Sequence, residues 1–210
     1  MKKNKLNLWF IQRIMMILLL TVYTAYCLLL NCLNILTITF LAIMVPCIAN
    51  PRKVCRSIRL PLINGIAINY CGFLLPLYST LILMICRAIQ IQYLILLLSL
   101  AIAIAVVHTY TTEKMILVNV IRYSLSFVFL SMVITHSEDI YYILPFSTIM
   151  GIALGSDILP AIFMYRSLES EGKVLVIGGY MALDSIPISL IISLSILLVF
   201  RIMQLFGVHF

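Results

Sequence analysis

The sequence predicts an all-α membrane protein, a polytopic bundle of about seven transmembrane helices. Its composition supports this class, because 64% of the 210 residues are hydrophobic and only 10% are charged, against about 25% charged in a typical soluble domain. The distribution of charge also supports it. Uncharged runs of about 18 residues or more recur along the chain, and each is long enough to cross a bilayer as a helix. We therefore expect a multi-pass protein of the cell membrane, built as a single integral membrane domain, 1–210.

The net charge of +7 arises from 14 Lys and Arg against 7 Asp and Glu. The basic residues are spread over the ends of the apolar runs, where they set membrane topology and contact lipid headgroups. No basic face is left over that could bind nucleic acid. The expected partner is the lipid bilayer, and nucleic acid is not expected.

The six cysteines have no C-x-x-C spacing. Most of them fall within apolar segments, where cysteine packs as a small hydrophobic residue. The chain also lacks H-E-x-x-H and G-x-S-x-G motifs, which mark common metal and nucleophile sites. We therefore expect no disulfide, no metal site and no cofactor.

The region 14–50 predicts a helical hairpin. It holds no charged residue, yet it is too long for one helix of about 20 residues. Asn31 and Asn34 predict a turn between helices at about 14–30 and 33–49, and Pro51 ends the second helix. The basic N-terminus and the basic loop 52–59 then lie on one side of the membrane. The excess of Lys and Arg places both in the cytoplasm.

Five further spans are expected at about 61–86, 91–108, 115–135, 141–163 and 174–200, which form a five-span bundle, 61–200. This order puts the C-terminus outside the cell. Gly151 and Gly155 form a small-xxx-small pair, which predicts close packing of the span 141–163 against a neighbouring helix.

Two carboxylates, Asp157 and Asp184, lie within the last two expected spans. An ionisable group in the bilayer core costs at least a few kcal/mol, so such a group is a candidate functional residue. The two spans are joined by a short loop and must be antiparallel neighbours, which allows the carboxylates to meet in the cytoplasmic half. We predict that Asp157 and Asp184, with the adjacent Ser156, bind an ion or a substrate.

A second polar feature lies in the span 61–86, where Asn69 precedes Gly72 and Pro76. Asp184 precedes Pro187 in the same way. A polar side chain beside a proline-interrupted turn is typical of the discontinuous helices of transporters. We expect Asn69 to join the site. The alternative is that these residues only shape helix packing.

The paired glycines Gly178 and Gly179 lie shortly before Asp184. Glycines in this position either interrupt a helix or let a neighbouring backbone approach closely. They do not form a nucleotide-binding loop, because no strand is expected before them and the surrounding sequence is apolar.

Three segments resemble motifs of a known family. Asn69-x-x-Gly72-x-Leu74-Leu75-Pro76 resembles N-x-G-G-x-x-x-P, and Gly155-Ser156-Asp157-Ile158-Leu159 resembles G-A-D-L-L. Ile177-Gly178-Gly179 with Asp184 and Ile186 resembles I-G-G-A-G-x-x-D-x-I. These motifs are similar to those of a family of uncharacterised prokaryotic multi-pass membrane proteins, domain of unknown function sixteen-fourteen. The resemblance spans about 120 residues and departs from the pattern at Met181 and Ser185. It implies a membrane bundle with a shared site, and it names no reaction.

The sequence leads to three candidate functions. The first is a small transporter or proton- or ion-coupled carrier, with the aspartates as ligands for the coupling ion and a small solute or ion as substrate. A chain of this size would need to form a homodimer to enclose a pathway. The alternative is an intramembrane aspartyl protease using Asp157 and Asp184 as catalytic residues, although the G-x-G-D and Y-D signatures are absent. The third is a non-catalytic membrane scaffold or partner subunit.

Overall fold

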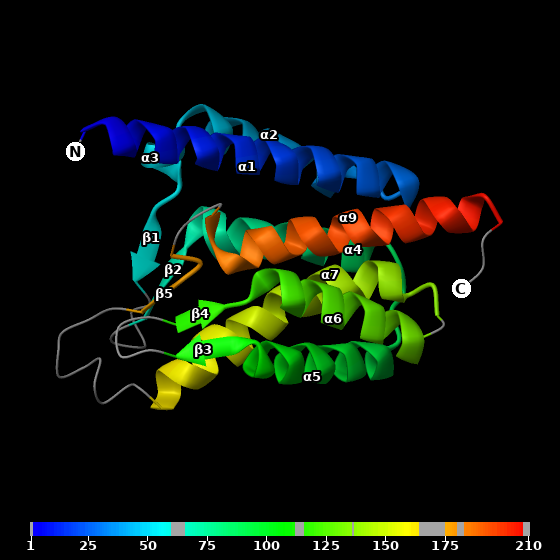
Figure 1. Ribbon diagram of the computed structural model, residues 1–210. Coiled ribbons are helices and arrows are strands. Elements are labelled where there is room, and N and C mark those ends of the chain that lie inside the picture. Colours follow the sequence, from blue (N-terminus) through cyan, green and yellow to red (C-terminus); the bar gives the residue numbers. More distant parts are fainter. Residues whose placement is uncertain are drawn as a thin grey trace.

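The computed structural model describes residues 2–59, 66–111, 116–135, 137–163, 175–179 and 183–207. Its helices run side by side, and short strands gather at the end of the bundle where the N-terminus lies (Figure 1). Helix α9 packs against α1, α6 and α7, and α7 packs in addition against α4 and α5. The helices are α1 (Lys2–Leu29), α2 (Ile35–Ala49), α3 (Pro51–Val54), η1 (Tyr70–Leu74), α4 (Leu75–Ile85), α5 (Ile91–Val107), α6 (Val120–Ile134), α7 (Ile140–Ile152), η2 (Ala153–Ile158) and α9 (Ser185–Leu205).

Three helices in the described ranges are long and apolar enough to cross a bilayer: Leu8–Leu29, Ile140–Phe163 and Ser185–Leu205. The remaining apolar helices are shorter, with 10–17 residues each. A helix of 15 residues is about 22 Å long, which is less than the roughly 30 Å of a hydrocarbon core. The predicted membrane-type helical bundle is therefore found, but the prediction of seven bilayer-length spans is wrong.

Short strands account for this difference. Strand β2 (Ile66–Asn69) lies between β1 (Ser57–Arg59), to which it is antiparallel, and β5 (Leu175–Ile177), to which it is parallel. Strand β3 (Thr109–Thr111) pairs with β4 (Ile116–Val118) in a separate antiparallel pair. Strands β2, β4 and β5 occupy the first part of segments that we predicted as continuous helix, whereas β1 and β3 lie in predicted loops. Short apolar runs rich in Ile and Val do not distinguish strand from buried helix by their pattern alone, so the expectation of helix throughout was wrong here.

The bundle is apolar outside and partly polar inside. Large apolar side chains such as Ile35, Ile91 and Val133 are exposed, whereas hydroxyl groups on the inner helices are buried. Tyr123 Oη, for example, donates to Thr148 O at 2.9 Å, and Thr148 Oγ1 lies 3.4 Å from Ser193 Oγ. Small polar residues at helix interfaces and apolar residues facing outward are typical of proteins surrounded by lipid.

The predicted hairpin between α1 and α2 is present, although α1 begins at Lys2 and not near residue 14. Asn31 adopts a positive φ of 52°, a conformation that asparagine tolerates better than most residues. Asn34 caps α2, because its side chain accepts a hydrogen bond from Thr37 N at 2.9 Å. Both asparagines therefore make the turn for which the sequence suggested them.

The predicted close packing at Gly151 and Gly155 is confirmed. A Cβ atom on Gly151 would lie 2.6 Å from Ala101 Cβ and 2.6 Å from Tyr123 Oη. One on Gly155 would lie 2.8 Å from Ile102 O. Helix α5 thus closely approaches α7 at Gly151 and its continuation η2 at Gly155, because these small residues take the place of larger side chains that would hold the helices apart.

Four cysteines form disulfides, Cys32–Cys86 and Cys55–Cys71, and the expectation of none was wrong. The partners are 54 and 16 residues apart in sequence, whereas their Cα atoms lie 5.8 Å and 5.0 Å apart. No local spacing reveals such pairs, because tertiary packing brings them together. Cys27 and Cys47 are buried and unpaired by disulfides.

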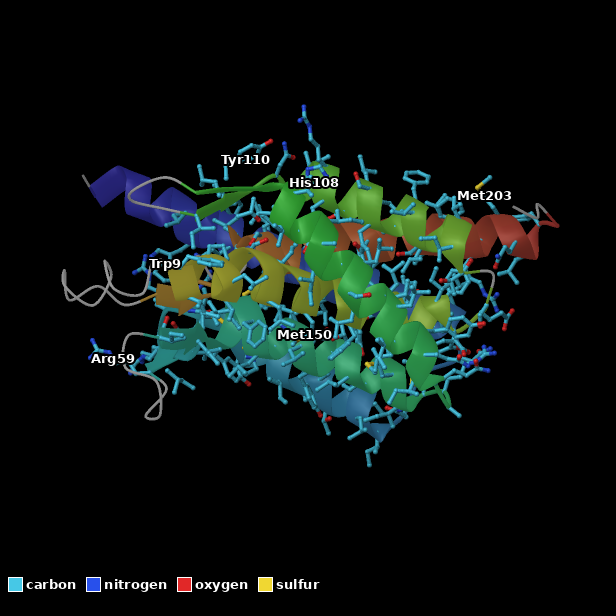
Figure 2. The ribbon with its side chains drawn as sticks, turned by 90° about the horizontal axis from the view of Figure 1, so that it is seen from below. Trp9, Arg59, His108, Tyr110, Met150 and Met203 are labelled. Atoms are coloured by element: carbon cyan, nitrogen blue, oxygen red, sulfur yellow. A yellow bond between two sulfur atoms is a disulfide. The ribbon has the colours of Figure 1, made fainter. Side chains whose placement is uncertain are left out.

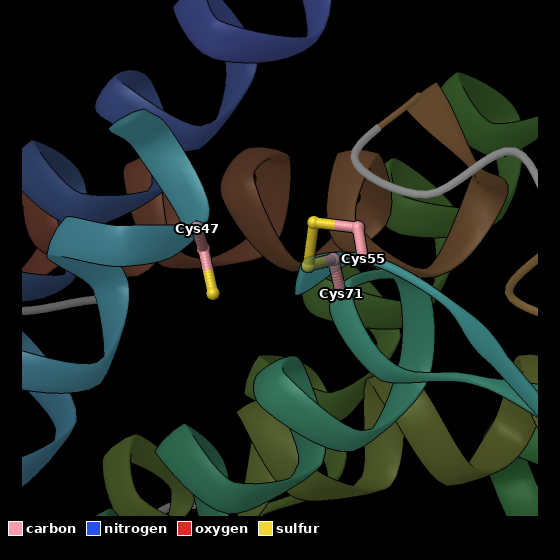
Figure 3. A group of neighbouring side chains, drawn as sticks. All are labelled: Cys47, Cys55 and Cys71. Carbon is pink, nitrogen blue, oxygen red and sulfur yellow. A yellow bond between two sulfur atoms is a disulfide. The ribbon is translucent and has the colours of Figure 1, made fainter. Parts of the chain in front are cut away.

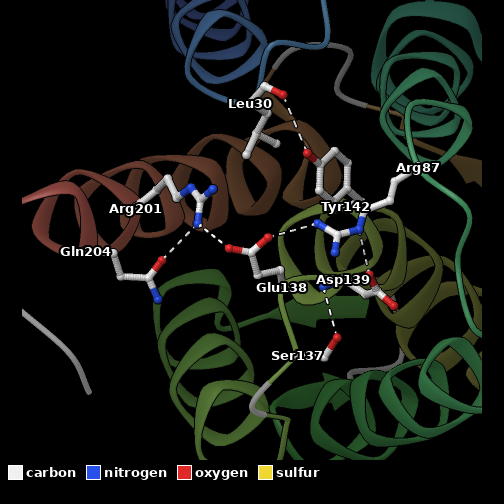
Figure 4. A network of polar contacts seen from close by, with 8 residues as sticks. All are labelled: Leu30, Arg87, Ser137, Glu138, Asp139, Tyr142, Arg201 and Gln204. Atoms are coloured by element: carbon white, nitrogen blue, oxygen red, sulfur yellow. Dashed lines mark hydrogen bonds and ion pairs between the residues drawn. The ribbon is translucent and has the colours of Figure 1, made fainter.

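Charged side chains join three elements at the end of the bundle opposite the three-stranded sheet (Figure 4). Arg87, which follows α4, contacts Glu138 Oε2 through Nη1 at 3.1 Å and Asp139 Oδ1 through Nε at 2.9 Å. Arg201 on α9 contacts Glu138 Oε1 at 3.1 Å. Glu138 is exposed, whereas Asp139 is only 6% exposed. The turn before α7 is therefore tied to α4 and α9.

Glu138 is expected to make stability depend on pH. Hydrogen bonds from Arg87 and Arg201 hold the pKa of this carboxyl below its ordinary value of 4.5. Its ionised form therefore stabilises the fold above about pH 4.5, and this contribution is lost as the pH falls through the lower pKa of the folded state. At pH 6 we expect Glu138→Gln to unfold with about 1 kcal/mol less free energy than the parent.

The measurement is thermal unfolding in detergent from pH 7 to pH 3 for both proteins. The difference between them should shrink below about pH 4.5 as the parent carboxylate is protonated. A difference that stays constant over the whole range would mean that the substitution disturbs packing and not an ionic contact.

Candidate functional site

Asp157 lies in η2, the π-helical continuation of α7. A π-helical turn widens the backbone spiral locally and occurs often at functional sites. The carboxylate of Asp157 interacts electrostatically with that of Asp184. The structure thus brings Asp157 and Asp184, which are 27 positions apart in sequence, within electrostatic range of each other at one end of the bundle.

Asp184 caps helix α9 and does not lie inside it, so its predicted position within the last span was wrong. Its backbone is extended, with φ −73° and ψ 160°. Its Oδ1 accepts hydrogen bonds from Ile186 N at 3.3 Å and from Ser185 Oγ at 3.0 Å. Aspartate is among the best N-cap residues, because its side chain satisfies N–H groups that have no partner in the first turn.

Pro187 belongs to the first turn of α9. Backbone N–H groups in a first turn have no partner within the helix, so proline is tolerated there. Pro187 therefore fits the start of α9 and does not interrupt it. Pro76 lies within the continuous helix Tyr70–Ile85, just after the π-helical turn η1. The two predicted helix breaks are thus a helix start and a π-helical turn.

Asn69 ends β2 and caps η1. Its Oδ1 accepts hydrogen bonds from Cys71 N at 3.0 Å and from Gly72 N at 2.9 Å, and its Nδ2 donates to Ser57 Oγ at 3.2 Å. The residue is 1% exposed. These bonds give Asn69 a structural role that joins β1, β2 and η1.

Gly72 and Gly178 bring the start of one helix against the turn that follows β5. A Cβ on Gly72 would overlap Gly178 O and would lie 2.8 Å from Gly178 C. Gly178 also has a φ of +71°, which side chains rarely adopt. Gly179 is exposed, and its Cβ would lie 3.0 Å from Val176 O. The close backbone contact therefore involves Gly72 and Gly178, with Gly179 beside it.

Ser156 is fully buried, and its Oγ lies 2.7 Å from Thr109 Oγ1. Thr109 begins β3, so this contact ties η2 to the two-stranded sheet next to Asp157. Sequence reasoning missed Thr109, Ser57 and Ser185. The available signal was weak, because each is a single hydroxyl whose partner is set by strand pairing or by a helix cap.

The site is built from two similar units, each a short strand followed by a helix with a polar N-cap residue. Parallel strands β2 and β5 each lead to a helix whose first turn is capped by a polar side chain, Asn69 for η1 and Asp184 for α9. Helices η1 and α9 are in contact. Helix N-termini carry partial positive charge, and Asp157 adds a second carboxylate within electrostatic range of Asp184. A bound proton or cation would relieve the repulsion between two such carboxylates.

The end of the bundle that carries the three-stranded sheet is also basic. Figure 2 shows Trp9 and Arg59 towards this end and Met203 at the other. Arg13 Nη2 donates to Ala49 O at 2.8 Å, and the Arg52 guanidinium lies 5.0 Å from the Trp9 ring centre. A separate group of three cysteines, Cys47, Cys55 and Cys71, has the sulfur ligands that could hold a metal.

These features define a helical, membrane-type bundle with a carboxylate pair beside two adjoining strand-to-helix units. No protein-family model, curated protein or solved structure matches the chain. Membership of the family domain of unknown function sixteen-fourteen, which the motifs suggested, therefore stays a prediction.

Proposed function

We propose that the protein is a multi-pass membrane carrier coupled to protons or a small cation, with Asp157 and Asp184 as the coupling pair. The observation that carries the proposal is the position of Asp157 in the π-helical turn η2, within electrostatic range of the Asp184 cap of α9. Asp157 lies within a bilayer-length helix, Ile140–Phe163, where an ionisable group is costly and is usually kept for function, and Asp184 caps the start of another, Ser185–Leu205. The bilayer is the expected partner, and a small solute or ion is the expected substrate.

The proposed orientation places the basic end of the bundle in the cytoplasm. Exposed Arg13, Arg52, Lys53, Arg56 and Arg59 belong to this end, and basic residues favour the cytoplasmic side. At the other end, Arg87 and Arg201 are offset by Glu138 and Asp139. The N-terminus is then cytoplasmic, and so is the approach to the aspartate pair.

The capping role of Asp184 offers a means of coupling binding to movement. Its Oδ1 holds the first turn of α9 through Ile186 N and Ser185 Oγ. A proton or cation bound between the carboxylates competes with these hydrogen bonds and loosens the start of α9. Because α9 packs against α1, α6 and α7, a shift at its start is transmitted to the centre of the bundle. A homodimer would supply the second wall of a pathway.

The test is transport by the purified protein in liposomes, measured with a pH-sensitive dye inside and an imposed gradient of protons, Na⁺ or K⁺. Asp157→Asn and Asp184→Asn should each slow cation-driven flux by about 100-fold or more, because each removes a carboxylate that holds the coupled proton or cation, and a lost interaction with a charged group costs up to about 3 kcal/mol. Asparagine caps helices as well as aspartate does, so Asp184→Asn removes the charge and keeps the cap.

Glu138→Gln is the matched control, because it removes a carboxylate from the opposite end of the bundle. It should leave flux unchanged. Full transport by both aspartate variants, with every cation tried, would contradict the proposal.

A second candidate, an intramembrane aspartyl protease, is favoured by one further observation. Strand β5 lies at the edge of the three-stranded sheet in the described residues, and the chain runs from β5 to Asp184. An extended peptide can pair with a sheet edge, which would lead it towards two carboxylates able to share a proton. Cleavage of membrane-segment peptides in detergent, abolished in both Asn variants, would support this function over transport. If neither activity is found, a scaffold role remains.

A further inference from the structure

Three cysteine side chains meet at the sheet end of the bundle (Figure 3). Cys47 comes from α2, Cys55 directly follows α3, and Cys71 belongs to η1. Their sulfur atoms all lie within 4.8 Å of one another, and the three residues are 0%, 1% and 1% exposed. In the structure Cys55 and Cys71 are joined as a disulfide, and the free Cys47 thiol lies next to it.

This group differs from an ordinary buried cysteine. Cys27 is also buried and free, but it lies within α1 and does not belong to the cluster of three. Cys47, Cys55 and Cys71 come from three separate elements, yet their sulfurs converge on one point. Convergence of soft ligands from different elements is what a metal site requires.

The compartment favours the reduced form of the pair. Cys55 lies between the basic residues Arg52 and Arg56 in the sequence. The cluster is therefore at the end of the bundle that the proposed orientation places in the cytoplasm. Cysteine pairs in the cytoplasm are kept in the reduced, dithiol form. A dithiol reductant converts the pair by exchange: its thiolate attacks one sulfur, its second thiol releases the mixed disulfide, and the reductant leaves as its own disulfide. Cys55 and Cys71 each gain a proton and one electron.

We propose that, in this reduced state, Cys47, Cys55 and Cys71 bind one Cu(I) ion through three thiolates. Thiolates select soft cations such as Cu(I), and three protons leave as the ion binds. With metal–sulfur bonds of about 2.3 Å, a planar three-sulfur site has sulfurs about 4 Å apart. The Cys47 sulfur lies within 4.8 Å of the other two, which is close to this spacing, and the bonded sulfurs of Cys55 and Cys71 have to move apart on reduction to reach it.

Two features of the cluster favour Cu(I) over zinc. Structural zinc is almost always bound by four ligands, whereas the cluster found among the described residues has three ligand atoms. Cys71 is also the second residue of η1, with its backbone N–H bonded to the Asn69 cap at 3.0 Å. A cysteine at a helix N-terminus is stabilised as the thiolate. The site therefore suits a low-coordinate, thiophilic ion.

The test begins with purified full-length protein in detergent, reduced with a phosphine, which takes up oxygen from water as the disulfide becomes two thiols. Cu(I) is then titrated against a chromophoric Cu(I) chelator. We expect one tightly bound Cu(I) per chain. Cys47→Ser should weaken binding by about 100-fold or more, because it removes one of three ligands. Cys27→Ser is the matched control and should bind like the parent.

X-ray absorption of the parent protein gives a readout that needs no variant. It should show three sulfur neighbours at about 2.3 Å from copper. One or two sulfurs, equal binding by Cys47→Ser, or tighter binding of Zn²⁺ than of Cu(I) would overturn the proposal. Asp157→Asn and Asp184→Asn should bind Cu(I) normally, so failure of the carrier proposal and failure of this one are distinguishable. The binding measurement does not depend on the membrane orientation.

Discussion

Replacing Gly72 by alanine is expected to lower the free energy of unfolding by about 3 kcal/mol, the upper end of the range for overpacking in a rigid site. The new methyl group would overlap Gly178 O and lie 2.9 Å from Gly178 Cα. Both backbones are held in place. Gly72 N is bonded to the Asn69 cap, and Gly178 directly follows β5, which is paired with β2. Neither can move away without breaking hydrogen bonds.

Thermal and denaturant unfolding in detergent measure this effect. Gly179→Ala is the matched control, because it makes the same change in the same turn, at an exposed position where the nearest atom lies 3.0 Å from the new Cβ. It should cost about 1 kcal/mol or less, as expected for an exposed site. Equal losses in the two variants would show that the contact between Gly72 and Gly178 is not close.

Replacing Asn69 by alanine is expected to cost about 2–3 kcal/mol, through loss of an N-cap and of buried hydrogen bonds. The change leaves the N–H groups of Cys71 and Gly72 and the hydroxyl of Ser57 without the side chain that now pairs with them. Buried polar groups left unpaired are costly, because water no longer reaches them. The first turn of η1 and its contact with the sheet should both weaken.

Two comparisons separate the parts of this effect. Asn69→Asp keeps an oxygen that accepts from the two N–H groups, so it should lose less stability than Asn69→Ala. Ser57→Ala removes only the bond to Nδ2 and should cost about 1 kcal/mol. If Asn69→Asp is as damaging as Asn69→Ala, the cap is not the source of the stability. An Asn69→Ala protein that stays fully stable but loses cation binding would indicate a ligand role.

The polar residues near prolines show how the same signal supports two interpretations. Asp184-Ser185-Ile186-Pro187 was interpreted as a carboxylate inside a broken span, but an N-cap residue followed closely by proline is also a helix-start signature. Asn69, before the apolar run of η1 and α4, is a similar case. The pairing of β2 with β5, which are over 100 residues apart in sequence, decided in favour of a helix start at both positions. A hydropathy window does not detect such pairing.

The aspartates could be found as candidate site residues from the sequence, whereas the cysteine cluster could not. Asp157 and Asp184 were conspicuous because ionisable residues are rare in apolar segments, and adjacent antiparallel segments suggested that they would approach each other. Cys47, Cys55 and Cys71 have spacings of 8 and 16 residues with no metal-binding pattern. Their convergence depends on how α2, α3 and η1 pack, so it could not be predicted from their spacing in the sequence.

Composition and local sequence patterns were enough to predict the class of this protein, its hairpin turn and the close packing at Gly151 and Gly155. Composition is a property of the whole chain, and the turn at Asn31 and Asn34 and the pair Gly151 and Gly155 depend on residues within about one helical turn of each other. Tertiary structure alone decided which apolar runs became strands, which cysteines paired, and that Glu138 joins Arg87 to Arg201. Those outcomes depend on contacts between distant segments, whose energies are set by the partner and not by the local sequence.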